Sequence, residues 1–196
     1  MDFVALAERC APSVHPMTMS AIVRVESGFN PYAIGVMGGQ LVRQPATAAE
    51  ATATARALET QGFNFDLGIA QVNRHNLAPY GLTYESAFDA CANLHAGAAI
   101  LSDCYLRATK KVTGEQASLR AALSCYSSGN FSGGFRDGYV TKVVAGPADD
   151  KAVSNAIPVV RQALSSHRFA PVSSSKKTAS PPPLTGSSES QSALLF

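Results

Sequence analysis

The chain has 196 residues, of which 46% are hydrophobic and 15% charged, and its formal net charge is +2 at pH 7. This length suffices for one domain with a hydrophobic core. The low charge and the lack of any long basic run exclude a nucleic-acid partner recognised by charge. No apolar segment approaches the roughly 20 residues of a membrane-spanning helix. The apolar run near the start covers only Phe3 to Ala7 and follows an acidic residue, so no signal peptide is recognised.

The apolar pattern predicts a mainly helical body over residues 1–147. The predicted helices cover residues 3–10, 17–27, 48–61, 91–109, 117–128 and 138–145. The third is preceded by Thr47 and has Glu50 three residues later, which is a capping-box signature, and Gly62 follows as a stop.

Two short stretches are predicted to be extended. Residues 33–45 contain two β-prone runs around Gly38-Gly39, which indicates a hairpin, and residues 63–73 alternate apolar with polar or small side chains. The predicted fold class is therefore mainly α (α+β), with a small β-hairpin or sheet element. Beyond this body, residues 148–170 predict a weakly structured extension, and the Ser/Pro-rich residues 171–196 predict a disordered tail.

The four cysteines are Cys10, Cys91, Cys104 and Cys125. They form no Cys-x-x-Cys pair, which argues against a structural zinc site. Cys91 and Cys104 lie on one predicted helix, where a rise of about 1.5 Å per residue separates them by roughly 20 Å. Any disulfide must therefore join different segments, with Cys10 or Cys125 as the natural partner. Buried free thiols are the alternative.

A carboxylate interrupts the apolar face of the second predicted helix. Met19, Ile22, Val23 and Glu26 follow the i, i+3, i+4, i+7 spacing of one helical face, and Gly28 then predicts the helix end. An apolar surrounding and a helix C-terminus both raise the pKa of a carboxyl group. Glu26 is therefore a candidate general acid for glycoside cleavage. The alternative is a structural Glu26 that points to solvent or pairs with Arg24 or Arg43.

The fifth predicted helix ends in a similar way. Leu119, Ala122, Leu123 and Tyr126 share one face, and Gly129 closes the helix. The Tyr126 hydroxyl would lie at the end of an apolar stripe. Taken alone, such an aromatic residue is more often part of a core than of a catalytic site.

A third candidate is the amide pair Gln71 and Asn73, which would share one strand face and could bind sugar hydroxyl and acetamido groups. Carboxylates that could act beside Glu26 are available, but none lies in a comparably apolar sequence; these are Asp66, Asp89, Asp103 and Asp137. Dinucleotide, P-loop, zinc-protease and serine-hydrolase motifs are absent, and the four histidines lack metal-ligand spacing. No metal or cofactor is predicted.

Five segments in order resemble lytic transglycosylases with the goose-lysozyme-like fold. They are "ESGFNP" at 26–31, "GIAQVN" at 68–73, "NLHAGAAIL" at 93–101, "CYSSGN" at 125–130 and "YVTKV" at 139–143. More narrowly, "CAPSVHPMTMSAIVRVESGFNPYAIGV" is similar to the peptidoglycan-cleaving component of bacterial type IV secretion systems. The resemblance spans roughly residues 9–145.

The resemblance implies a role for five residues. Glu26 matches the family's sole catalytic carboxylate, and Ser27 would help to set its geometry. Gln71 would contact the glycan, while Tyr126 and Tyr139 match the family's two site tyrosines. Two positions depart from the family pattern, because Ala70 and Ser127 replace a methionine and an asparagine.

The implied reaction cleaves the bond between N-acetylmuramic acid and N-acetylglucosamine and closes a 1,6-anhydro ring without water. The implied location is the periplasm or cell envelope, and the implied partners are peptidoglycan and other secretion components. Two alternatives stay open: a muramidase that uses water with Asp66 as base, and a non-catalytic wall-binding or assembly module.

Overall fold

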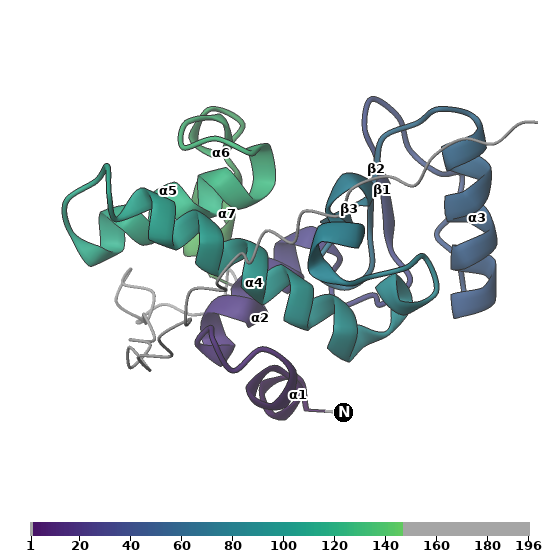
Figure 1. The fold of residues 1–196 in the computed structure, drawn as a ribbon, viewed down its shortest axis with the longest axis horizontal. Helices are drawn as coiled ribbons and strands as arrows, with labels where there is room; N and C mark the ends of the chain where they lie inside the picture. The colour runs from purple at the N-terminus through teal and green to yellow at the C-terminus, as the bar shows by residue number, and fades with distance from the viewer. Residues whose placement is uncertain (1, 147–196) are drawn as a thin grey trace, which may run out of the picture. The chain divides into compact units, whose positions relative to one another are not determined.

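The structure is a computed structural model that describes residues 2–146 (Figure 1). The predicted extension of residues 148–170 and the predicted tail of residues 171–196 lie outside the described residues. The α-helices are α1 Phe3–Cys10, α2 Pro16–Glu26, α3 Ala48–Thr60, α4 Ala90–Ala108, α5 Glu115–Ser128, α6 Gly133–Arg136 and α7 Tyr139–Val144. Three 3-10 turns, η1 Arg74–Asn76, η2 Ala78–Tyr80 and η3 Ser86–Phe88, precede α4.

The six predicted helices are confirmed to within two residues at each end, and the short α6 is an addition that the apolar pattern did not indicate. Local chemistry explains the ends of α2. Pro16 occupies the first turn, where its missing N–H costs no hydrogen bond, and the His15 side chain accepts from the Met17 N–H at 3.2 Å. Ser27 caps the C-terminus, and Gly28 follows with a φ of +58°. Within residues 2–146, no helix is long and apolar enough to cross a membrane.

The sheet has the order β1-β2-β3 and is antiparallel, with β1 Ile34–Val36, β2 Phe65–Leu67 and β3 Val72–Asn73. The predicted hairpin around Gly38-Gly39 is therefore wrong, because β1 pairs with β2 in the register Ile34 to Leu67. The Gln44 side chain takes the place of a second strand on the other edge of β1. Its Oε1 accepts from the Ile34 N–H at 2.8 Å, and its Nε2 donates to the Ile34 carbonyl at 3.0 Å.

The described residues contain two clusters of buried apolar side chains. The first gathers residues from α1, α2, α4, α5 and α7, and the second packs α3 and the 3-10 turns against the sheet. Helix α4 serves both, since Leu94 faces the first cluster and Ala96 the second. The helical body and the sheet therefore meet along α4 (Figure 1).

Two disulfides fasten α4 to its neighbours. Cys10 of α1 bonds to Cys91, and Cys104 bonds to Cys125 of α5, with Cα atoms 5.1 Å and 5.8 Å apart. The prediction that any bridge joins different segments is confirmed, and the alternative of free thiols is wrong. Because both bridges tie distant parts of the chain, they restrict the unfolded state and stabilise the fold.

Candidate active site

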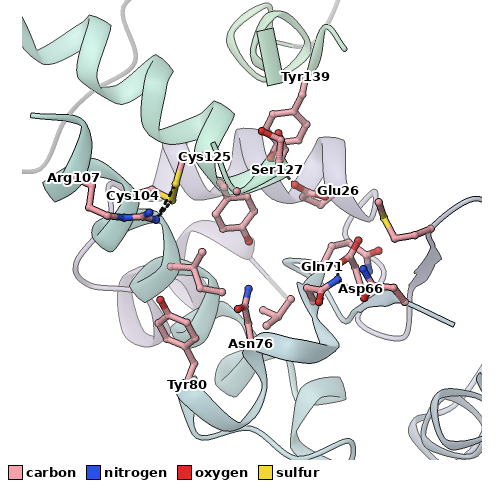
Figure 2. A pocket seen from close by; sticks show the side chains of 18 residues that line it. Glu26, Asp66, Gln71, Asn76, Tyr80, Cys104, Arg107, Cys125, Ser127 and Tyr139 are labelled. Atoms are coloured by element: carbon pink, nitrogen blue, oxygen red, sulfur yellow. Dashed lines mark hydrogen bonds between the residues drawn. A yellow bond between two sulfur atoms is a disulfide. The ribbon is translucent and has the colours of Figure 1, made fainter. Parts of the chain in front are cut away.

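A cleft of about 470 Å³ opens where α2, α4, α5 and α7 meet the sheet (Figure 2). This volume is typical of ligand sites. The predicted site residues that line the cleft are Glu26, Gln71, Asn73, Tyr126 and Tyr139. Ser27 is not among the lining residues, although it is next to Glu26.

Glu26 occupies the place predicted for it. The preceding residues of its face, Met19, Ile22 and Val23, are each 0% exposed, and Glu26 reaches from the last turn of α2 into the cleft (Figure 2). Helical periodicity thus explains how a carboxyl group comes to lie at the border between the core and the cleft.

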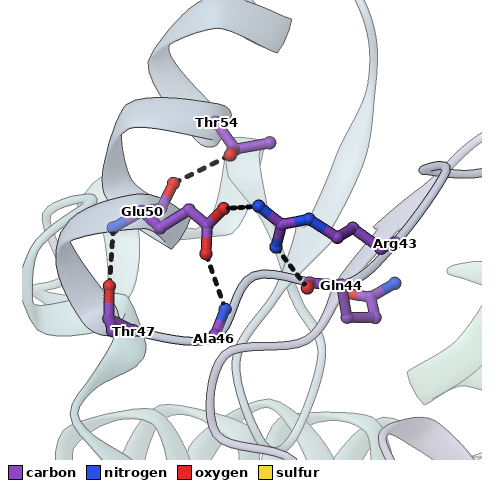
Figure 3. A network of polar contacts seen from close by, with 6 residues as sticks. All are labelled: Arg43, Gln44, Ala46, Thr47, Glu50 and Thr54. Atoms are coloured by element: carbon purple, nitrogen blue, oxygen red, sulfur yellow. Dashed lines mark hydrogen bonds and ion pairs between the residues drawn. The ribbon is translucent and has the colours of Figure 1, made fainter.

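Neither arginine that might have neutralised Glu26 does so. Arg24 donates from Nη2 to the Lys142 carbonyl at 3.2 Å. Arg43 pairs with Glu50 at the start of α3 (Figure 3), where the Thr47 hydroxyl caps the Glu50 N–H at 3.2 Å. The alternative of an arginine-paired structural Glu26 is therefore wrong.

The surroundings of Glu26 suit a group that both gives and takes a proton. Burial raises its pKa from 4.5 to about 7. The Tyr139 hydroxyl donates to Oε1 at 2.5 Å and lowers this pKa, while the nearby negative charge of Asp66 raises it. Near neutral pH the carboxyl is therefore present in both protonation states.

Replacing Tyr139 by phenylalanine is expected to raise the pKa of Glu26 further above 7. The variant removes the hydrogen bond that stabilises the ionised carboxylate and leaves the burial in place. NMR titration of a labelled Glu26 carboxyl would measure the change. An unchanged or lower pKa in Tyr139→Phe would contradict the role assigned to this hydrogen bond.

The Tyr126 hydroxyl forms its hydrogen bond with the backbone of the turn between β2 and β3. Its hydroxyl donates to the Ala70 carbonyl at 2.5 Å. Burial raises the pKa of Tyr126 well above its ordinary value, so the hydroxyl remains a neutral donor. Gly97 of α4 allows this approach, because a Cβ there would lie 2.8 Å from the Ala70 Cβ and 3.0 Å from the Tyr126 hydroxyl.

The same turn is held from two further sides. Ser27 donates to the Ile69 carbonyl at 2.7 Å, which ties the end of α2 to the turn. Asn93 of α4 is fully buried; its Oδ1 accepts from the Ala70 N–H at 2.7 Å, and its Nδ2 donates to the Leu67 carbonyl at 2.9 Å. Sequence reasoning missed Asn93, although a polar side chain on the buried face of a helix is the same kind of signal as Glu26.

The Gln71 side chain makes hydrogen bonds within the protein that the sequence did not predict. Its backbone has a φ of +49°, and its Nε2 donates to the carbonyls of Ala33 at 3.0 Å and Gly68 at 2.8 Å. Both amide hydrogens are thus used, and the side chain offers a substrate its Oε1 as an acceptor. A Cβ at Gly35 would come within 2.7 Å of that oxygen, so the glycine leaves it space.

Asp66 lies in the same cleft and in a more buried setting than its sequence indicated. Burial raises its pKa, and a hydrogen bond from Asn73 Nδ2 at 2.8 Å lowers it. Asn73 also donates to Asn64 Oδ1 at 3.0 Å, so the Asn73 amide links Asp66 and Asn64. The pairing of the three strands brings Asp66 into the cleft, where its neighbours Asn73 and Asn64 are polar.

Comparison with known proteins identifies the family of the chain. Residues 3–140 match the family model described as "Transglycosylase SLT domain". The chain is 57% identical over 168 residues to "Type IV secretion system protein virB1" of Brucella suis biovar 1 (strain 1330), a match that covers 83% of this chain and 71% of that protein. It is 39% identical over 144 residues to "Protein virB1" of Rhizobium radiobacter, which covers 72% of this chain and 59% of that protein.

No solved structure gives a significant match to the chain. The family match nevertheless extends from α1 into α7 and contains every residue of the cleft described above. The mainly helical fold with a small antiparallel sheet agrees with the predicted lysozyme-like class. The chain therefore belongs to the SLT family of lytic transglycosylases.

Proposed function

We propose that this protein cleaves the β-1,4 bond between N-acetylmuramic acid and N-acetylglucosamine in peptidoglycan and leaves a 1,6-anhydromuramic end. The observation that carries the proposal is the state of Glu26. A carboxyl group with a pKa of about 7, hydrogen-bonded to Tyr139 and facing a cleft, is suited to general acid and general base catalysis.

In the first half of the reaction, protonated Glu26 donates its proton to the oxygen of the glycosidic bond. The bond from that oxygen to the muramic C1 breaks, and the substrate's own 2-acetamido group stabilises the cationic centre. Glu26 is now ionised, and the Tyr139 hydrogen bond to its Oε1 stabilises this charge. The other carboxyl oxygen is left to carry the proton.

In the second half, ionised Glu26 takes the proton of the muramic C6 hydroxyl, and the C6 oxygen attacks C1 to close the anhydro ring. The proton balance returns Glu26 to its starting state, and no water is consumed. One carboxyl group thus replaces the pair that ordinary glycosidases require. The hydrogen bonds of Ser27, Asn93 and Tyr126 fix the turn that precedes Gln71, and the Gln71 side chain lines the cleft in which the glycan would bind.

The biological setting proposed is the cell envelope, where local opening of the wall would make room for a type IV secretion apparatus. The name of the Brucella suis relative, a type IV secretion system protein, supports this setting, as does the envelope location of peptidoglycan. The same name is compatible with a non-catalytic assembly role, and substitution of Glu26 separates the two readings.

A water-using muramidase is the second candidate, because Asp66 shares the cleft with Glu26. Asp66→Asn distinguishes the two reactions. We expect this variant to keep anhydro products and to lose less than about tenfold in kcat/KM, because Asp66 acts only through its charge on Glu26. Its pH optimum should move to lower pH, since removal of that charge lowers the Glu26 pKa. Mass spectrometry of digested sacculi identifies the product. Loss of all activity in Asp66→Asn, together with hydrolysed reducing ends in the wild-type digest, would favour the muramidase.

A further inference from the structure

The cleft contains a cationic side chain that the proposed mechanism does not use. Arg107 of α4 lines the cleft with Tyr80, on the side away from Asp66 and Glu26 (Figure 2). Its guanidinium is held in place, because Nη2 donates to both sulfurs of the Cys104–Cys125 disulfide at 3.3 Å and 3.0 Å. Its charge therefore has a defined position at one end of the cleft.

Asp103, one turn before Arg107 on α4, does not form an ion pair with it. The Tyr80 hydroxyl donates to Asp103 Oδ2 at 2.7 Å, and Arg107 contacts only the Asp103 backbone carbonyl, at 3.4 Å from Nε. Within residues 2–146, no ion pair joins Arg107 to a carboxylate. A guanidinium presents its N–H donors in a planar fork that matches a carboxylate. An arginine that lines a cleft without a carboxylate partner therefore favours an anionic group on the ligand.

The two acidic groups that line the cleft, Glu26 and Asp66, lie on its other side from Arg107 (Figure 2). Burial raises the pKa of both carboxyl groups. The end of the cleft at Arg107 is therefore the positively charged end, which favours an anionic group on the ligand there.

We propose that Arg107 binds a carboxylate carried by the muramic acid residue of the glycan, and so selects muramic-containing strands over uncharged amino-sugar chains. This inference rests on the proposed function. The sugar rings themselves are uncharged, and the anionic groups stem from the lactyl ether of muramic acid. The carboxylate is either the free lactyl group of peptide-free strands or a carboxylate of the attached peptide; both offer the same chemistry to Arg107.

Binding in a catalytically inactive background tests this without depending on turnover. Full-length Glu26→Gln is compared with the double variants that add Arg107→Gln, Arg107→Lys or, as a matched control on α1, Arg9→Gln. The probes are intact sacculi, amidase-treated glycan strands with free lactyl groups, and sacculi whose carboxyl groups are converted to amides. We expect Arg107→Gln to weaken binding to intact sacculi about tenfold at low salt, Arg107→Lys to recover part of it, and Arg9→Gln to have no effect.

The probes separate the two sources of the carboxylate. A defect that persists on amidase-treated strands identifies the lactyl group, and a defect that disappears there identifies the peptide. An equal loss on amide-capped sacculi, or no loss on intact sacculi, would overturn the proposal, because a structural effect of the substitution does not follow the charge of the ligand. If Glu26→Gln binds no glycan and the wild type releases no muropeptide, both the proposed function and this inference fail.

Discussion

Glu26→Gln is expected to lower the rate of peptidoglycan cleavage by at least on the order of 10³-fold. The amide has nearly the size of the acid and still accepts the Tyr139 hydrogen bond, but it can neither donate nor take the proton that the reaction requires. The loss appears in both halves of the proposed mechanism, because the same group acts twice.

The rate would be followed as release of soluble fragments from purified sacculi. Glu8→Gln, at an exposed position of α1, is the matched control and should keep wild-type activity. Activity within tenfold of the wild type in Glu26→Gln would remove Glu26 from the chemistry. Retention of every secretion phenotype by a folded but inactive Glu26→Gln would instead favour the non-catalytic assembly role.

The wild-type protein is expected to lose about 3 kcal/mol of stability through Glu26 as the pH rises from 4 to 8. The pKa of Glu26 is about 7 in the folded protein and near 4.5 when the chain is unfolded. Between these values the folded state binds more protons than the unfolded state, so the free energy of unfolding falls as pH rises, by about 1.4 kcal/mol per pKa unit. The effect is complete above the folded pKa.

Glu26→Gln isolates this contribution. The variant should match the wild type near pH 4 and exceed it at pH 8, because the amide has no charge to bury. Urea unfolding at both pH values measures the two differences. A wild type whose stability, relative to the variant, is independent of pH would show that the Glu26 pKa is not raised.

Periodicity in single segments was enough to predict most of the helices and the two ends of apolar faces where Glu26 and Tyr126 lie. These signals are local, because a helix repeats every 3.6 residues. A polar side chain on an apolar helix face can therefore be recognised within a window of about seven residues. The pairing of the strands was harder to predict from the sequence. Gln44 covers the edge of β1 through its side chain, and no local pattern distinguishes this from a hairpin strand.

The partners of the site residues depend on tertiary contacts. The resemblance assigned Tyr126 to the site without naming its partner, and its hydroxyl reaches Ala70, 56 residues away in sequence. Asp66 and Arg107 carry no signal in their own segments, because strand pairing and the path of α4 bring them into the cleft. Tyr139 could be assigned only through the family resemblance, and its hydrogen bond to Glu26 now gives that assignment a physical basis.

The most direct test of the proposed mechanism is digestion of purified peptidoglycan in water enriched in heavy oxygen, followed by mass spectrometry of the released fragments. Because the C6 hydroxyl of the substrate replaces water, we predict muropeptides that end in 1,6-anhydromuramic acid, are lighter by one water than hydrolysis products, and carry no heavy oxygen. Fragments with a reducing end that contains heavy oxygen would contradict the proposal and identify a muramidase.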